Sequence, residues 1–363
     1  MSRLDDLLKQ YCPNGVEFWP LERCCNILDN KRKPVRKSTR EVGDYPYYGA
    51  NGIQDYVADY IFDGTYVLVG EDGSVVTQNG NPVVNWAQGK IWVNNHAHIV
   101  SEGNGVLLRF IFHYLQTVNI TDLVHGNIPK LTGRDFKAIK IPVPPLEVQR
   151  EIVRILDNFT ELTAELTAEL TARKKQYEYY RNEMLSLDTA IPKVKLADVA
   201  VSISSGKNKE RLDDGAFPVY GSTGTISKTN TSVYDWEQIL VAHVGANAGF
   251  VHLAEGRYDV SDNTLIVDVK KEHSLKYVYY LLQNMNLNRY AKGGGQPLIT
   301  AGDLKKMSVP MPKRDVQDRI VNVLDNFDAI CYDLNIGLPA EIEARQKQYE
   351  YYRDMLLSFK EAE

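Results

Sequence analysis

Cysteine is scarce in this chain, with four residues among 363. Cys24 and Cys25 are adjacent, and together with Cys12 and Cys331 they have the spacing of neither a metal site nor a disulfide framework. Long apolar runs are also absent, since none approaches the roughly 18 residues that a membrane span needs. The first dozen residues predict a short amphipathic helix and lack the apolar centre of a signal peptide. We therefore expect a cytoplasmic protein with reduced thiols.

The chain has no excess of positive charge. It carries 42 basic and 47 acidic residues, a net charge of −5, which is not typical of a free-standing nucleic-acid-binding protein. The charge is unevenly distributed: residues 1–145 are neutral and 192–312 carry +2, whereas 146–191 and 313–363 carry −3 and −4. The net negative charge is therefore concentrated in residues 146–191 and 313–363.

Motifs of catalysis are missing as well. No Gly-x-x-x-x-Gly-Lys-Ser/Thr sequence is present, which argues against a P-loop nucleoside triphosphatase. Residues 81–84, Asn-Pro-Val-Val, begin like the Asn-Pro-Pro-aromatic motif of amino-methyltransferases but lack its second proline and its aromatic residue, so we interpret them as a turn. His96 and His98 alternate in a predicted strand, and we interpret them as a structural pair because further zinc ligands are lacking. We expect no catalytic site and no metal.

What the sequence does contain is an internal repeat. Lys-Gln-Tyr-Glu-Tyr-Tyr-Arg occurs at 175–181 and again at 347–353. Fainter matches accompany it, pairing 45–49 with 217–221, 109–116 with 276–283, 141–144 with 309–312, and 148–159 with 316–327. Two copies that share one task on their helices and perform different tasks with their domains would diverge in this way. Drift under helix-packing constraints is the alternative.

Each copy predicts a mixed α/β domain followed by a long helix. Strand composition marks 65–69, 91–93, 239–241 and 264–269, while 109–116 and 276–283 suit either a helix or a strand. The spacing of Thr132 and Asp135, and of Thr300 and Asp303, predicts capped short helices. The resulting fold class is α+β, with boundaries at 1–145 (first domain, with an N-terminal helix), 146–191 (first helical region), 192–312 (second domain) and 313–363 (second helical region).

The first helical region predicts one helix over 146–187, with apolar residues at three- and four-residue spacing. About 40 residues make a rod of about 60 Å, and its apolar stripe needs a partner helix. The second helical region supplies such a stripe, interrupted at Gly337 and Pro339. Thr-Ala-Glu-Leu occurs in tandem at 163–166 and 167–170, either as a helix-forming spacer or because length itself matters.

These features resemble the specificity subunit of type I restriction-modification systems, particularly the subfamily with such tandems. The resemblance rests on the Ile-Pro-Val-Pro-Pro-Leu-Glu-Val-Gln segment at 141–149 and its counterpart, Ile-Leu-Asp-Asn-Phe at 155–159, the tandem, and the repeated Lys-Gln-Tyr-Glu-Tyr-Tyr-Arg. It covers the chain from about residue 16 to 359. It implies two similar target recognition domains on long helices that pack antiparallel as a coiled-coil-like rod.

The resemblance also implies partners. Each domain would read one half of a split sequence in double-stranded DNA, and the helices would space the domains and dock two methyltransferase subunits. Those subunits would bind S-adenosylmethionine, and motor-nuclease subunits would use ATP and Mg²⁺, so no cofactor is expected in this chain. The partners would supply much of the phosphate contact that dominates DNA affinity. An antiparallel arrangement suits a split site, because it places two similar readers over two half-sites.

Candidate contact residues follow from residue type and predicted exposure. For DNA they are Lys31, Arg32, Lys33, Arg36, Lys37, Tyr48, Asn51, Gln78 and Asn79 in the first domain, and Lys207, Lys209, Ser222, Thr223, Lys228, Lys292 and Gln296 in the second. For partner docking they are Lys175, Gln176, Tyr177, Lys347, Gln348 and Tyr349. Each DNA candidate is otherwise a solvated loop residue, and each docking candidate otherwise a contact between helices.

Two other classes of function remain open at this point. A scaffold with two protein-binding domains on a helical rod would suit the acidic net charge. An enzyme with an unrecognised site would transfer a methyl group without partners.

Overall fold

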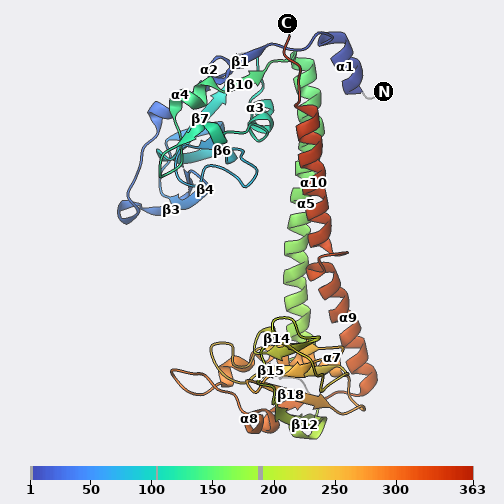
Figure 1. The fold of residues 1–363 in the computed structure, drawn as a ribbon. Helices are drawn as coiled ribbons and strands as arrows, with labels where there is room; N and C mark the ends of the chain where they lie inside the picture. The colour runs from blue at the N-terminus through green and yellow to red at the C-terminus, as the bar shows by residue number, and fades with distance from the viewer. Residues whose placement is uncertain (1–2, 104, 187–190, 363) are drawn as a thin grey trace. The chain divides into compact units, whose positions relative to one another are not determined.

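The computed structural model of the chain describes residues 3–103, 105–186 and 191–362 (Figure 1). Two compact units are present, Met1–Leu166 with Ile342–Glu363, and Thr167–Glu341. Each unit thus contains one sheet-rich domain and parts of the long helices. The boundaries between recognition domains and helical regions at 145, 191 and 312 stay a prediction. None of the helices in the described residues has the length and apolar character needed to cross a membrane.

Unit 1 consists of a mixed sheet with short helices around it. Its strands are β1 (Phe18–Pro20), β2 (Cys25–Ile27), β3 (Val42–Gly49), β4 (Gly52–Val57), β5 (Phe62–Gly70), β6 (Val84–Val93), β7 (Ala97–Glu102), β8 (Val124–His125), β9 (Lys130–Leu131) and β10 (Lys140–Pro142). Its helices before residue 146 are α1 (Arg3–Tyr11), α2 (Leu21–Cys24), η1 (Asp29–Lys31), η2 (Lys37–Thr39), α3 (Leu108–Leu115), η3 (Thr121–Leu123) and α4 (Gly133–Ala138).

Unit 2 contains a similar set of strands and short helices. Its strands are β11 (Lys193–Lys195), β12 (Ala200–Ser205), β13 (Phe217–Gly221), β14 (Gly224–Thr229), β15 (Gln238–Ala242), β16 (Val251–Ala254), β17 (Asp259–Val260), β18 (Thr264–Val269) and β19 (Ser308–Pro310). Its short helices are α6 (Leu196–Val199), α7 (Leu275–Asn284), η4 (Leu287–Tyr290) and α8 (Ala301–Lys306). The three long helices of the chain are α5 (Leu146–Met184), α9 (Arg314–Tyr332) and α10 (Leu338–Leu356).

The two units have the same strand topology. In unit 1 the strand order is β2-β7-β5-β6-β3-β4, with β3 and β6 parallel. In unit 2 the orders β12-β18-β15-β16 and β14-β13-β17 reproduce it, with β13 and β17 parallel, because the long strand β6 is replaced by the two shorter strands β16 and β17. The duplication inferred from faint sequence matches is therefore a duplication of fold.

Equivalent glycines close the equivalent hairpins. Gly52 follows β3 with φ +102°, and Gly224 follows β13 with φ +105°, a backbone conformation that other residues rarely adopt. Both hairpins also shift register one position before the turn, between Tyr47 and Tyr48 and between Val219 and Tyr220. The two hairpins therefore share a register shift and a positive-φ glycine at equivalent positions.

Antiparallel helix pairing occurs within each unit. In unit 1 the first part of α5 runs alongside α10 (Figure 1). Between them, Phe159 stacks on Tyr352 at 5.3 Å between ring centroids. In unit 2 the second part of α5 pairs with α9, where Tyr177 and Tyr180 contact Phe327 at 5.8 and 5.9 Å. The apolar stripe of α5 is thereby covered in part: Leu156 and Tyr177 are buried, whereas Leu162, Leu166 and Leu170 are half-buried.

Several element predictions are confirmed. The second helical region breaks between α9 and α10 at Gly337. The segments 109–116 and 276–283, for which both a helix and a strand were left open, form the helices α3 and α7. Thr132 and Thr300 cap α4 and α8 through Asp135 and Asp303. The predicted end of the first helix at 187 lies outside the described residues, in which α5 ends at Met184.

Candidate nucleic-acid interface

Most DNA candidates of unit 1 lie on exposed turns. The exposed ones are Lys31, Lys33, Arg36, Lys37, Asn51, Gln78 and Asn79. Asn51 occupies the turn between β3 and β4, and Gln78 and Asn79 occupy the turn before β6. These side chains are accessible to a ligand, and their assignment to DNA stays a prediction.

The prediction of Tyr48 as an exposed DNA contact is corrected by the structure. Its side chain is only 9% exposed and lies in the core formed by residues such as Phe62 and Leu68. Burial raises the pKa of its hydroxyl. Strand β3 continues to Gly49, and its alternation directs the Tyr48 side chain into this core.

Arg32 is a second correction, because its guanidinium is already bound within the unit. Its side chain is 12% exposed and donates from Nη1 to Glu71 Oε2 and to the carbonyl oxygen of Ala97, both at 2.6 Å. Its Nε donates to the carbonyl oxygen of Asp29 at 2.9 Å. Arg32 therefore differs from its exposed neighbours: it binds the protein and does not project into solvent.

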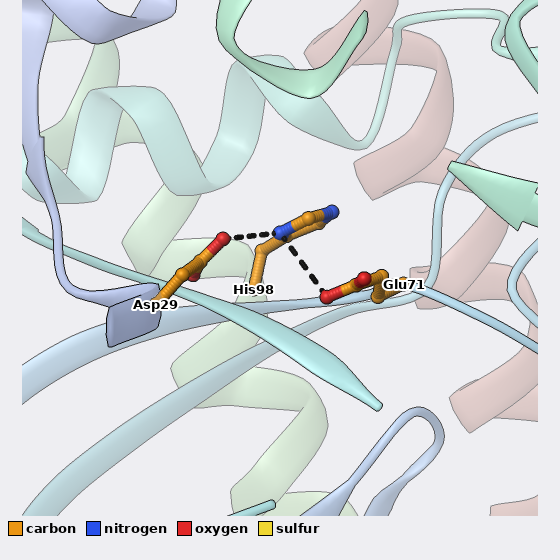
Figure 2. A group of neighbouring side chains, drawn as sticks. All are labelled: Asp29, Glu71 and His98. Carbon is orange, nitrogen blue, oxygen red and sulfur yellow. Dashed lines mark hydrogen bonds and ion pairs between the residues drawn. The ribbon is translucent and has the colours of Figure 1, made fainter. Parts of the chain in front are cut away.

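Glu71 and Asp29 lie on either side of the buried His98 (Figure 2). His98 Nδ1 is 2.6 Å from Asp29 Oδ2 and 3.7 Å from Glu71 Oε2, and the ring stacks on Phe136 at 4.3 Å between centroids. Lys130 Nζ adds a contact to Glu71 at 3.1 Å. Although burial opposes ionisation, the hydrogen bonds from His98 and Arg32 lower the pKa of Asp29 and of Glu71.

The ligand atoms of Asp29, Glu71 and His98 lie within 4.8 Å of one another, as in a metal site. However, His98 Nε2 is 3.0 Å from the carbonyl oxygen of Leu131, so both ring nitrogens face oxygen acceptors and both donate when the ring is protonated. Both ring nitrogens are therefore already engaged by oxygen atoms of the protein. Arg32 and Lys130 already neutralise Glu71, so this group is a charge network that supports a loop.

His96, the other histidine of the predicted pair, has a separate role. Its Nδ1 is 2.5 Å from Asp72 Oδ1, and its ring is about half exposed. It precedes strand β7, whereas His98 lies within it, so the two histidines do not form one site.

In unit 2 the candidates lie on the loop after β12, on the β13–β14 hairpin and on the loop before α8. Lys207, Lys209, Thr223, Lys228, Lys292 and Gln296 are exposed, and Ser222 is half-buried. Lys292 forms an ion pair with Asp303 at 2.5 Å. Ser222 donates to the carbonyl oxygen of Asn263 at 3.4 Å. Ser222 and Thr223 thus occupy the turn that corresponds to the Asn51 turn of unit 1.

The repeated helix motif divides into buried and exposed positions. Tyr177 and Tyr349 are 3% and 4% exposed, so these two docking candidates are instead contacts within the units. Lys175, Gln176, Lys347 and Gln348 are exposed, and Lys347 forms an ion pair with Glu343 at 2.5 Å. Missed by the prediction were Tyr179 and Tyr351, equivalent residues that are 62% and 66% exposed. Their recurrence at the same motif position could have identified them.

In each unit the helix of the domain (α3 or α7) is hydrogen-bonded to an equivalent aspartate of a long helix. In unit 1, Asp157 Oδ1 accepts from Arg109 Nε at 2.7 Å and from His113 Nε2 at 2.8 Å, and the hydroxyl of Tyr349 lies 2.9 Å from His113 Nδ1. In unit 2, Asp325 accepts from Lys276 at 2.8 Å and from the Tyr280 hydroxyl at 2.7 Å. The aspartate thus recurs at 157 and 325 because the domain helix of each unit, α3 or α7, packs on a long helix, α5 or α9.

Comparison with known proteins agrees with this arrangement. Residues 13–173 and 192–344 match the family described as type I restriction modification DNA specificity domain. The chain belongs to this family. It is 37% identical to a putative type I restriction enzyme specificity subunit of Haemophilus influenzae, over 95% of this chain and 96% of that protein. It is 34% identical to the EcoR124I/EcoR124II specificity subunit of Escherichia coli, over 72% of this chain and 73% of that protein.

Solved structures of type I systems share the fold of this specificity-family chain. The S subunit of a type I restriction-modification system from Mycoplasma genitalium aligns with a TM-score of 0.62 and 16% identity, over 94% of this chain and 96% of that one. A chain from a study of complex assembly and conformational transition of the type I system aligns with a TM-score of 0.55, over 95% and 98%. The α+β fold with two sheet-rich domains and long helices is thereby confirmed.

Proposed function

We propose that this chain is the DNA-recognition subunit of a type I restriction-modification complex, in which each domain reads one half of a bipartite target in double-stranded DNA. The single observation that supports this most strongly is the pair of topologically equivalent domains in a chain of the specificity family. Equivalent loops carry different polar residues, Asn51 in one hairpin turn and Ser222-Thr223 in the other. Two readers of one architecture and different loop chemistry suit two different half-sites.

The helices would space the domains and dock two methyltransferase subunits. Tyr179 and Tyr351 support this part of the proposal, since large exposed aromatic side chains at equivalent positions suit anchors for two copies of one partner. The exposed Lys175, Gln176, Lys347 and Gln348 flank them. Methyl transfer from S-adenosylmethionine, and ATP-driven motor and nuclease activity, would belong to partner subunits acting on DNA in the cytoplasm, with this chain non-catalytic.

Methylome sequencing tests the proposal directly. We expect a split methylated motif in cells that contain the whole system, its loss when the gene for this chain is deleted, and its return when the gene is restored. With purified components, the chain and its methyltransferase partners should retain DNA of that motif selectively and in a salt-dependent way. Unchanged methylation after deletion would contradict the proposal.

The scaffold alternative and the enzyme alternative give different results. A scaffold with protein-binding domains would assemble with partners and show no sequence preference for DNA. An enzyme would transfer a methyl group from S-adenosylmethionine as the purified chain alone, and that result would overturn the assignment of catalysis to partners.

A further inference from the structure

Residues 29–40 of unit 1, here called the basic loop, expose cations that have no ion-pair partner among the described residues. The loop contains two single-turn 3-10 helices, η1 and η2, and no strand. Its exposed cations are Lys31, Lys33, Arg36 and Lys37. None of the ion pairs formed by the described residues involves them, because the nearby carboxylates of Asp29, Glu71 and Asp55 pair with His98, Arg32 and Arg40.

The loop backbone is held by side chains from the sheet. Trp92 Nε1 donates to the carbonyl oxygen of Lys33 at 2.6 Å, and the backbone N–H of Val35 donates to the Tyr47 hydroxyl at 3.0 Å. Arg40 lies 4.0 Å above the ring of Tyr47, donates from Nε to the carbonyl oxygen of Val35 at 3.1 Å, and pairs with Asp55 at 3.1 Å. The backbone is thus fixed at several points along the loop.

Arg32 provides the deepest of these attachments. Its bonds to Glu71, to the carbonyl oxygen of Ala97 and to the carbonyl oxygen of Asp29 connect the loop to strand β7 and to the residue after β5. Arg32 and Lys130 contact Glu71, and Arg32 also contacts Asp29, so both carboxylates of the network beneath the loop are already paired with cations. These two carboxylates are therefore not available to pair with the exposed cations of the loop.

We propose that the basic loop binds DNA backbone phosphates and thereby sets the register of the unit 1 domain on its half-site, with Arg32 as a positioning residue. This proposal rests on the proposed function. A fixed backbone lowers the ordering cost of binding, and four exposed cations suit a polyanion. Phosphate contacts set position, whereas bases are read at groove edges. The loop exposes cations, while exposed Asn and Gln candidates lie on the turns at 51 and 78–79.

The test measures DNA affinity of the chain with its methyltransferase partners against salt concentration. The variants are Lys31→Gln, Lys33→Gln, Arg36→Gln and Lys37→Gln, singly and combined, on duplexes of the methylated motif. Each lost phosphate contact lowers the slope of log affinity against log salt by about 0.9. We expect the slope of the combined variant to fall by the amount of two or more lost phosphate contacts, with the base preference unchanged in both half-sites. Lys137→Gln, an exposed cation on α4, is the matched control and should leave the slope unchanged.

Arg32→Met tests the positioning role. We expect it to lower the slope although Arg32 itself is 12% exposed, whereas a merely structural residue would change the unfolding midpoint alone. An unchanged slope in the combined surface variant would overturn this phosphate-binding role, and so would a change in preferred bases, which would make the loop a base reader. Failure of the unaltered complex to prefer any sequence would instead overturn the proposed function.

Discussion

The buried His113 links the domain helix α3 to both long helices of unit 1. Asp157 accepts from Nε2, so the neutral ring accepts at Nδ1 from the hydroxyl of Tyr349. Burial lowers the pKa of His113, and the hydrogen bond to Asp157 only partly offsets this effect. Tyr349→Phe leaves that buried acceptor unpaired, so we expect the free energy of unfolding to fall by about 1–3 kcal/mol.

Tyr351→Phe is the matched control for Tyr349→Phe, because the same atom is removed from an equivalent ring that is 66% exposed. We expect a change within about 0.5 kcal/mol for the control. Urea unfolding of both variants measures the difference, and equal losses would contradict the assigned hydrogen bond.

His252 predicts a pH dependence of stability in unit 2. Both of its ring nitrogens are buried without a hydrogen-bond partner, and burial lowers its pKa from 6.5 to about 4. Below pH 6.5 the unfolded chain therefore binds a proton that the folded unit does not, and stability falls until about pH 4. His252→Phe should reduce the slope of unfolding free energy against pH between 5 and 6.5. An identical slope in the variant would show that the ring is not held neutral.

At the level of single residues, the sequence predicted which side chains are exposed better than which side chains form ion pairs within the protein. Lys31, Arg32 and Lys33 form one basic run, yet only the middle residue is taken into the protein. Its partner Glu71 follows 39 residues later, at the end of a strand whose neighbours the sequence does not reveal. Long-range ion pairs depend on sheet order, and local pattern carries no information about it.

The tandem in α5 makes helix length testable. Residues 163–170 are helical, and the turn at 163–166 contains no buried side chain. Deleting 163–166 removes about 6 Å of helix, a little under two base-pair steps. We expect the gap of the methylated motif to shorten by one or two base pairs with both half-sites unchanged, as read by methylome sequencing. As a control, replacing Thr163 and Glu165 by alanine keeps the helix length and should keep the gap. Altered half-site bases in the deletion variant would contradict the hypothesis that the length of α5 sets the gap.

Elements with strong local signals were predictable. The helix caps at Thr132 and Thr300 and the break at Gly337 depend on residues within one turn. The aromatic segments that became α3 and α7 were ambiguous, since their residue types suit strands and their spacing suits helices. These helices contact α5 and α9 through Arg109 and Lys276, and such contacts lie outside the local sequence.

At the scale of the whole molecule, each unit has its own core, and the domain contacts its helices through a short repeated set of residues. In unit 2 that set includes Lys276 and Tyr280, which bond to Asp325 and Asp328. Replacing 192–312 by the matching segment of a family member with a different methylated motif should therefore change one half-site. The other half-site and the gap should stay the same, as methylome sequencing of the exchange strain would measure. The informative control is a second exchange in which Lys276 and Tyr280 are retained: it should raise the yield of folded protein without altering the new half-site. A change in both half-sites would mean that the domains do not read DNA independently, and would refute the division of the target between them.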